Sequence, residues 1–127
     1  MKKITIITNT ADETLKVGYM LGSNLKGGEI IQLISDLGGG KTTLTKGIVK
    51  GAGSYDTVAS PTFTIKKEYH SSNLTIHHFD FYRLDNPGIV GYELQEYLSR
   101  DSDIIIIEWG DIIKDVLPKD TILIDIN

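Results

Sequence analysis

The sequence has 127 residues and a formal net charge of −4, with 40% hydrophobic and 24% charged residues. This length is typical of one domain with its own core. No apolar run approaches the roughly 20 residues of a membrane helix, and the first residues are typical of a strand rather than a signal peptide. The absence of cysteine excludes disulfides and thiolate metal sites. We therefore expect a cytoplasmic protein.

The negative net charge also limits the kinds of partner that we expect. A protein that binds a nucleic acid unaided usually presents a basic face, because phosphate neutralisation drives the association. Beyond the N-terminus, Lys66 and Lys67 are the only adjacent basic pair. We therefore expect no DNA and no membrane as a partner, and RNA only through another subunit.

Hydrophobic periodicity and turn residues predict alternating strands and helices. In chain order these are a strand over 2–8, a helix over 11–25, a buried strand over 30–34, a helix over 41–50, a hairpin with strands over 62–69 and 74–81, a helix over 92–98, a buried strand over 104–107, a helical turn over 112–117 and a strand over 121–126. Thr10 and Glu13 have the spacing of a capping box. This order predicts a single α/β domain over residues 1–127, with a central mixed sheet flanked by helices.

The segment from Ile30 to Thr43 has the context of a phosphate-binding loop. A short strand leads into three glycines, which are followed by Lys41, Thr42 and a helix. Such a loop turns its amides inward on phosphates, and the helix N-terminus adds a positive dipole. Lys41 is predicted to reach the β and γ phosphates, and the Thr42 hydroxyl to bind Mg²⁺.

Ser35 departs from the pattern G-x-x-x-x-G-K-[ST], whose first glycine it replaces. Its Cβ restricts backbone conformations that glycine allows. The alternative interpretation is a glycine-rich turn before a helix on which Lys41 is merely exposed.

Two strand ends offer the carboxylate that such a loop needs for its metal. The apolar run 104–107 ends in Glu108, and the second hairpin strand contains Asp80. One direct carboxylate and Thr42 suffice for Mg²⁺, which keeps several waters, so we assign Glu108 to the metal. Asp80 is then an outer-shell ligand or orients the attacking water. Either carboxylate would alternatively cap a turn.

Other residues nearby have two interpretations. Arg83 would neutralise charge on the transferred phosphate or form a surface ion pair with Asp85 or Glu93.

The adjacent His77 and His78 alternate across a strand, so we predict no histidine metal site. The guanine-reading sequence [NT]-K-x-D does not occur, which favours ATP.

Four blocks in order resemble the TsaE (YjeE) family, from about Thr14 to Pro118. They are Ser35-Asp-Leu-Gly-Gly-Gly-Lys-Thr-Thr43, Ser60-Pro-Thr-Phe-Thr64, His78-Phe-Asp-Phe-Tyr-Arg-Leu84 and Glu108-Trp109. The P-loop is common to many families, whereas the middle two blocks are specific.

The resemblance implies a P-loop NTPase-like fold and an Mg²⁺-dependent ATPase that forms ADP and phosphate, slowly when alone. The family acts beside TsaD and TsaB in the threonylcarbamoyl modification of adenosine, at position 37, in certain tRNAs. This chain would therefore meet tRNA only indirectly, through the complex.

Carried onto this chain, the resemblance assigns ATP binding to the region of Ala11, near the base, and to the loop residues Asp36, Leu37, Gly38, Gly39, Gly40, Lys41, Thr42 and Thr43. It assigns catalytic roles to Lys41, Asp80 and Glu108, and the metal to Thr42 and Glu108. The stretches 60–64 and 80–84 would respond to the γ phosphate. Trp109 would pack beside the site or simply in the core.

Two alternative functions remain at this point. Ser35, and the expectation that relatives continue past Asn127 with a strand and an arginine near the nucleotide, motivate a nucleotide-dependent assembly switch with little turnover. A small-molecule P-loop kinase usually needs an arginine-rich lid, and the chain has only two arginines, Arg83 and Arg100.

Overall fold

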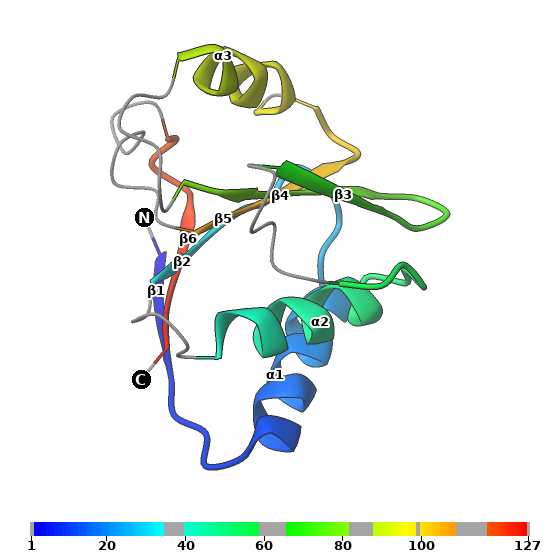
Figure 1. Cartoon of the computed structure of the whole chain (residues 1–127), viewed down its shortest axis with the longest axis vertical. Helices are drawn as coiled ribbons and strands as arrows, with labels where there is room; N and C mark the ends of the chain where they lie inside the picture. The colour runs from blue at the N-terminus through cyan, green and yellow to red at the C-terminus, as the bar shows by residue number, and fades with distance from the viewer. Residues whose placement is uncertain are drawn as a thin grey trace.

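A six-stranded mixed sheet lies at the centre of the protein (Figure 1). The computed structural model describes residues 2–34, 40–58, 66–81, 88–98, 100–108 and 117–126. The strands are β1 (Lys2–Ile6), β2 (Ile30–Ile34), β3 (Lys66–His70), β4 (Thr75–Asp80), β5 (Asp103–Glu108) and β6 (Ile122–Ile126). The helices are α1 (Ala11–Ser23), α2 (Lys41–Gly51) and α3 (Gly88–Tyr97). The predicted α/β fold class is confirmed.

The strand order in the sheet is β1-β6-β2-β5-β4-β3. Strands β1, β6, β2, β5 and β4 are parallel, and β3 runs antiparallel to β4. The β3–β4 pair is the predicted hairpin, and its turn is held by the Ser71 amide donating to the Leu74 carbonyl at 2.9 Å. The parallel strands all finish on one side of the molecule, which we call the carboxyl end of the sheet.

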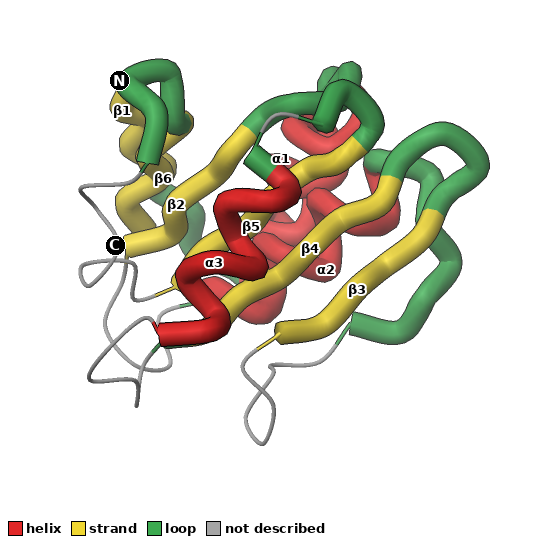
Figure 2. The backbone as a smooth tube through the Cα atoms, turned by 90° about the horizontal axis from the view of Figure 1, so that it is seen from above, coloured by secondary structure: helices red, strands yellow, loops and turns green. Residues whose placement is uncertain are grey.

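Helices cover both faces of this sheet (Figure 2). The face toward α1 and α2 carries the larger core, which includes Ile31, Leu33, Leu44, Ile48, Tyr69, Ile76, Ile104, Ile106 and Ile124. On the other face, Leu94 of α3 packs with Ile30, Phe79, Phe81, Ile105 and Ile107. All six residues of β5 are buried, because a central strand covered on both faces has no side that faces solvent.

Helices α1 and α2 touch through four glycines, which we call the glycine crossing: Gly18, Gly22, Gly47 and Gly51. A Cβ at any of the four would overlap a backbone carbonyl oxygen of the facing helix. The two backbones therefore approach more closely than larger side chains would allow. No local pattern in the sequence predicts this contact.

The predicted cap of α1 forms with one difference. The Thr10 side chain accepts from the Glu13 amide at 3.1 Å, as expected. The Glu13 carboxylate accepts from the Asn9 amide at 3.2 Å, one residue before the cap. Both side chains still satisfy amides at the helix start.

Some predicted bounds differ from those observed. Helix α1 ends at Ser23, with Asn24 as its C-cap, and α3 begins at Gly88 rather than at residue 92. The predicted helical turn over 112–117 lies outside the described residues except for Leu117. In the described part of the chain, no helix has the length and apolar character needed to cross a membrane.

Candidate functional site

The predicted site residues that the structure describes lie on the side of the molecule where the parallel strands end, the position where parallel α/β sheets bind ligands. Strand β2 ends at Ile34 and α2 begins at Lys41, so the predicted phosphate loop connects these elements. Four predicted phosphate-binding residues lie outside the described residues, namely Asp36, Leu37, Gly38 and Gly39. Their roles stay predictions.

The start of α2 has the features of an anion-binding helix end. Gly40 is the N-cap with φ of 95°, in the left-handed region that favours glycine. It has no side chain to cap the helix, and the first turn contains no acidic residue. By contrast, α1 has the Thr10 cap and two acids in its first turn. A helix start without a capping side chain or an acidic first turn has the electrostatic character that suits a bound anion.

Lys41 and the two residues after it form the first turn of α2. Lys41 is only 6% exposed, and Thr42 and Thr43 are half-buried. The Leu44 amide donates to the Gly40 carbonyl at 3.0 Å, and the Thr45 hydroxyl donates to the Lys41 carbonyl at 2.8 Å. These bonds fix the backbone of the turn that carries the predicted lysine and metal-binding hydroxyl.

The two predicted carboxylates are direct neighbours in the sheet. Asp80 of β4 pairs with Glu108 of β5, and Glu108 pairs with Leu33 of β2. The amide of Phe81 donates to the Glu108 carbonyl at 3.0 Å, which extends the pairing to this end. The order β2-β5-β4 therefore places the start of α2, Glu108 and Asp80 at one end of the sheet.

Ala11, predicted to lie near the base, is exposed at the first position of α1. Strands β1 and β2 both run parallel to β6, so the helices that follow them start on the same side of the molecule. Arg83 and Trp109 lie outside the described residues, and their alternatives stay open.

Glu108 has a buried histidine as its neighbour. The carboxylate is 3% exposed, and its Oε2 lies 2.5 Å from Nε2 of His78. On the other side of the ring, Nδ1 of His78 lies 3.4 Å from the Tyr69 hydroxyl. Sequence reasoning assigned His78 no role. Its position two residues before Asp80 puts both on one strand face, but its pairing with Glu108 depends on the β4–β5 register.

His77 faces the opposite side of the sheet, as the alternation predicted. Its Nδ1 lies 3.4 Å from the Glu68 carboxylate and its Nε2 lies 3.4 Å from that of Asp103. The ring stacks on Tyr97 of α3 with centroids 3.9 Å apart. Burial, followed by the nearby Lys66 ammonium, lowers the pKa of His77, although both carboxylates act against this shift.

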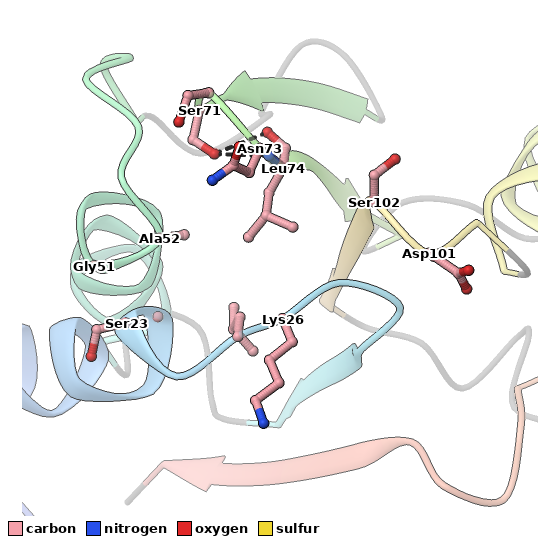
Figure 3. A pocket seen from close by; sticks show the side chains of 12 residues that line it. Ser23, Lys26, Gly51, Ala52, Ser71, Asn73, Leu74, Asp101 and Ser102 are labelled. Atoms are coloured by element: carbon pink, nitrogen blue, oxygen red, sulfur yellow. Dashed lines mark hydrogen bonds between the residues drawn. The ribbon is translucent and has the colours of Figure 1, made fainter.

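A hollow of about 380 Å³ lies at the opposite end of the sheet (Figure 3). The last residues of α1 and α2 line one side, and the β3–β4 turn and Asp101–Ser102 line the others. None of the described residues of the predicted nucleotide site lines this hollow. The two features are therefore separated by the length of the strands.

Comparison with known proteins agrees with this architecture. The family model described as threonylcarbamoyl adenosine biosynthesis protein TsaE matches residues 8–127. The tRNA threonylcarbamoyladenosine biosynthesis protein TsaE of Rickettsia felis is 39% identical over 123 residues, covering 96% of this chain and 70% of that protein. The protein of the same name in Bacillus subtilis is 36% identical over 127 residues, covering 100% and 79%.

A solved structure gives the same result at the level of the fold. The crystal structure of YdiB from Bacillus subtilis superposes with a TM-score of 0.73 at 30% identity, covering 93% of this chain and 72% of that one. The sheet flanked by helices is thus a P-loop NTPase-like fold. The chain belongs to the TsaE family, whose members take part in tRNA threonylcarbamoyladenosine biosynthesis.

Proposed function

We propose that this chain binds ATP with Mg²⁺ at the carboxyl end of its sheet, hydrolyses the ATP, and so supports a TsaD–TsaB complex that modifies tRNA in the cytoplasm. One observation carries the nucleotide part of the proposal. The start of α2 has a glycine N-cap with no capping side chain, and it lies at the same end of the sheet as the paired carboxylates Asp80 and Glu108.

The start of α2 suits a phosphate group. Helix N-terminal amides and the helix dipole together stabilise bound anions. Lys41, at the first helical position, adds a positive charge on a largely buried side chain. Electrostatic attraction is stronger away from bulk water, so a phosphate held there would interact strongly with this lysine. The neighbouring loop residues 36–39 would complete the cradle.

The described residues also fit a magnesium ion. Mg²⁺ prefers oxygen ligands and usually takes one or two from the protein, with the rest from water and phosphates. The Thr42 hydroxyl and the Glu108 carboxylate would supply them. When bound, Mg²⁺ would neutralise charge on the β and γ phosphates. Asp80, next to Glu108 in the sheet, would accept a hydrogen bond from the attacking water and orient it.

Turnover of ATP by point variants tests these roles. Lys41→Ala and Glu108→Gln are expected to reduce the hydrolysis rate by about 10²- to 10³-fold, the usual loss when one stabilising group is removed from a transition state. Lys46→Ala is the matched control, because Lys46 lies on the same helix but is exposed. Turnover that survives both active-site changes would contradict the assignment.

Partner binding tests the rest of the proposal. The net charge of −4 supports contact with tRNA through other subunits rather than directly. The affinity for TsaD–TsaB, measured with ATP, with ADP and with a non-hydrolysable analogue, should differ between the triphosphate and diphosphate states. Equal affinity in all three would show that the nucleotide does not control assembly.

The affinity measurement and the turnover assay together separate the assembly switch from the ATPase. Partner affinity that depends on the bound nucleotide, without measurable turnover, would favour the switch.

A further inference from the structure

We propose that His78 is a positioning residue that holds the carboxylate of Glu108 for the metal, and that Tyr69 sets the tautomer of its ring. The inference rests on the proposed Mg²⁺–ATP site and adds to it a series of hydrogen bonds across three strands. This hydrogen-bond series begins at Tyr69 on β3, passes through His78 on β4 and ends at Glu108 on β5.

The three side chains are buried together. Their exposed fractions are 2% for Tyr69, 0% for His78 and 3% for Glu108. The apolar side chains of Ile76 and Ile106 belong to the same face of the sheet, within the core under α1 and α2. A hydrogen bond in such surroundings is stronger than in water, and a carboxylate left there without a donor is costly.

In a neutral imidazole, the two contacts of the ring fit one tautomer. A carboxylate accepts hydrogen bonds, so the 2.5 Å contact with Glu108 requires the proton on Nε2 of His78. In a neutral ring Nδ1 then carries the lone pair, and the Tyr69 hydroxyl, 3.4 Å away, can donate to it. The ring nitrogen that carries the proton is set by the bond that the other nitrogen makes.

The sheet register brings the three residues to one face. His78 pairs with Ile106, two residues before Glu108 on β5, and Tyr69 pairs with Ile76, two residues before His78 on β4. Each donor therefore reaches its acceptor on the diagonal between neighbouring strands. The hydrogen-bond series ends with Glu108 at the carboxyl end of the sheet, where the metal would bind.

These hydrogen bonds would hold the Glu108 carboxylate ready as a preorganised metal ligand. The bond to His78 fixes one oxygen of the Glu108 carboxylate, which restricts the side chain to one orientation before any metal arrives. Outer-shell partners of this kind contribute about 10- to 100-fold to metal affinity. Loss of the donor should therefore weaken binding of the metal and leave contacts to the nucleotide alone unchanged.

Two amide substitutions at His78 separate positioning from a structural role. In His78→Gln the amide nitrogen stands near the position of Nε2 and can still donate to Glu108. In His78→Asn the amide is one methylene shorter and cannot reach it. His77→Asn is the control, because His77 lies on the same strand but faces away from Glu108.

The readout is Mn²⁺ binding to the complex with ADP, measured by paramagnetic resonance, together with the affinity for fluorescent ADP in EDTA. His78→Asn should weaken Mn²⁺ about 10- to 100-fold and leave the metal-free affinity unchanged. His78→Gln should restore Mn²⁺ binding, and His77→Asn should match the wild type. Equal Mn²⁺ affinity in the Asn variant, the Gln variant and the wild type would overturn the proposal.

Tyr69→Phe gives a second test that removes only one buried oxygen. It should weaken Mn²⁺ roughly fivefold, as expected for loss of a neutral hydrogen bond, and it decides the matter if His78→Asn does not fold. Unchanged Mn²⁺ affinity in Tyr69→Phe would overturn the hydrogen-bond series. Failure of the wild type itself to bind Mn²⁺ with nucleotide would instead overturn the proposed site, and this inference with it.

Discussion

Two adjacent histidines of β4 lie in different chemical surroundings because a strand turns successive side chains to opposite faces. His78 faces α1 and α2 and contacts Glu108, which we propose as a metal ligand. His77 faces α3, between the carboxylates of Glu68 and Asp103. Within the described residues, neither ring nitrogen of His77 has a hydrogen-bond partner. At the scale of the residue, β4 therefore carries two histidines with different roles. We propose that His78 positions a metal ligand, and we expect the protonation of His77 to change the free energy of unfolding.

The lowered pKa of His77 predicts a dependence of stability on pH. The unfolded chain, with the usual value of 6.5, takes up a proton at a higher pH than the folded chain. The free energy of unfolding should therefore fall as the pH drops below about 6.5, by at most about 1.4 kcal/mol per pH unit. This loss continues until the pH reaches the lower pKa of the folded chain.

Urea unfolding at pH 7.5 and pH 5.5 (about one unit on either side of the reference value) measures this effect. Subtracting the result for His77→Gln from that of the wild type removes the contributions of the other histidines. Glu68, whose pKa is lowered by its hydrogen bond to Lys66, loses its contribution only at more acidic pH. The same pH dependence in the variant and the wild type would contradict the assignment to His77.

At the scale of the element, the glycine crossing explains how α1 and α2 can share one face of the sheet. A Cβ on Gly22 would overlap the carbonyl of Ile48, and one on Gly47 would overlap that of Leu15. Glycine in a helix interior normally costs about 0.5–1 kcal/mol relative to alanine. Close packing of the two backbones offsets that cost here.

Gly22→Ala and Gly47→Ala are therefore expected to destabilise the protein, although alanine is the better helix former. We expect each to lower the free energy of unfolding by about 1–3 kcal/mol, the usual cost of overpacking. Ser23→Ala, at an exposed position next to Gly22, should change it by less than about 0.5 kcal/mol. Urea unfolding checks all three variants, and greater stability in either glycine variant would contradict the close contact.

The sequence predicted elements well where one local signal decides them. The isoleucines of β5 and the short apolar run of β2 are typical of buried strands, and three glycines before Lys41 mark the start of α2. Helix α3 was predicted to start four residues late, because Gly88 follows a proline and such a pair is typical of a loop. Packing of Leu94 and Tyr97 against the sheet outweighs that local preference.

Contacts between elements could not be predicted in the same way. The last strand, β6, lies between β1 and β2, and nothing local in residues 122–126 indicates that place. The neighbours Asp80 and Glu108 were found because each stands at or near a strand end. The bond from His78 to Glu108 was missed because it depends on the register between β4 and β5, which only the assembled sheet fixes.

At the scale of the whole molecule, the parallel strands separate two regions. The carboxyl end of the sheet holds the start of α2 and the paired carboxylates, whereas the hollow lined by the ends of α1 and α2 lies at the other end. Helix α2 spans the distance between them. The central claim concerns the first region, where we propose that Mg²⁺–ATP binds.

Titration calorimetry with Mg²⁺–ATP tests this claim most directly. The wild type should give a saturable heat of binding, Lys41→Ala should lose it, and Lys46→Ala should retain it, because only Lys41 lies at the buried start of α2. A wild type that shows neither heat nor saturation, or a Lys41→Ala variant with an unchanged binding curve, would contradict the account.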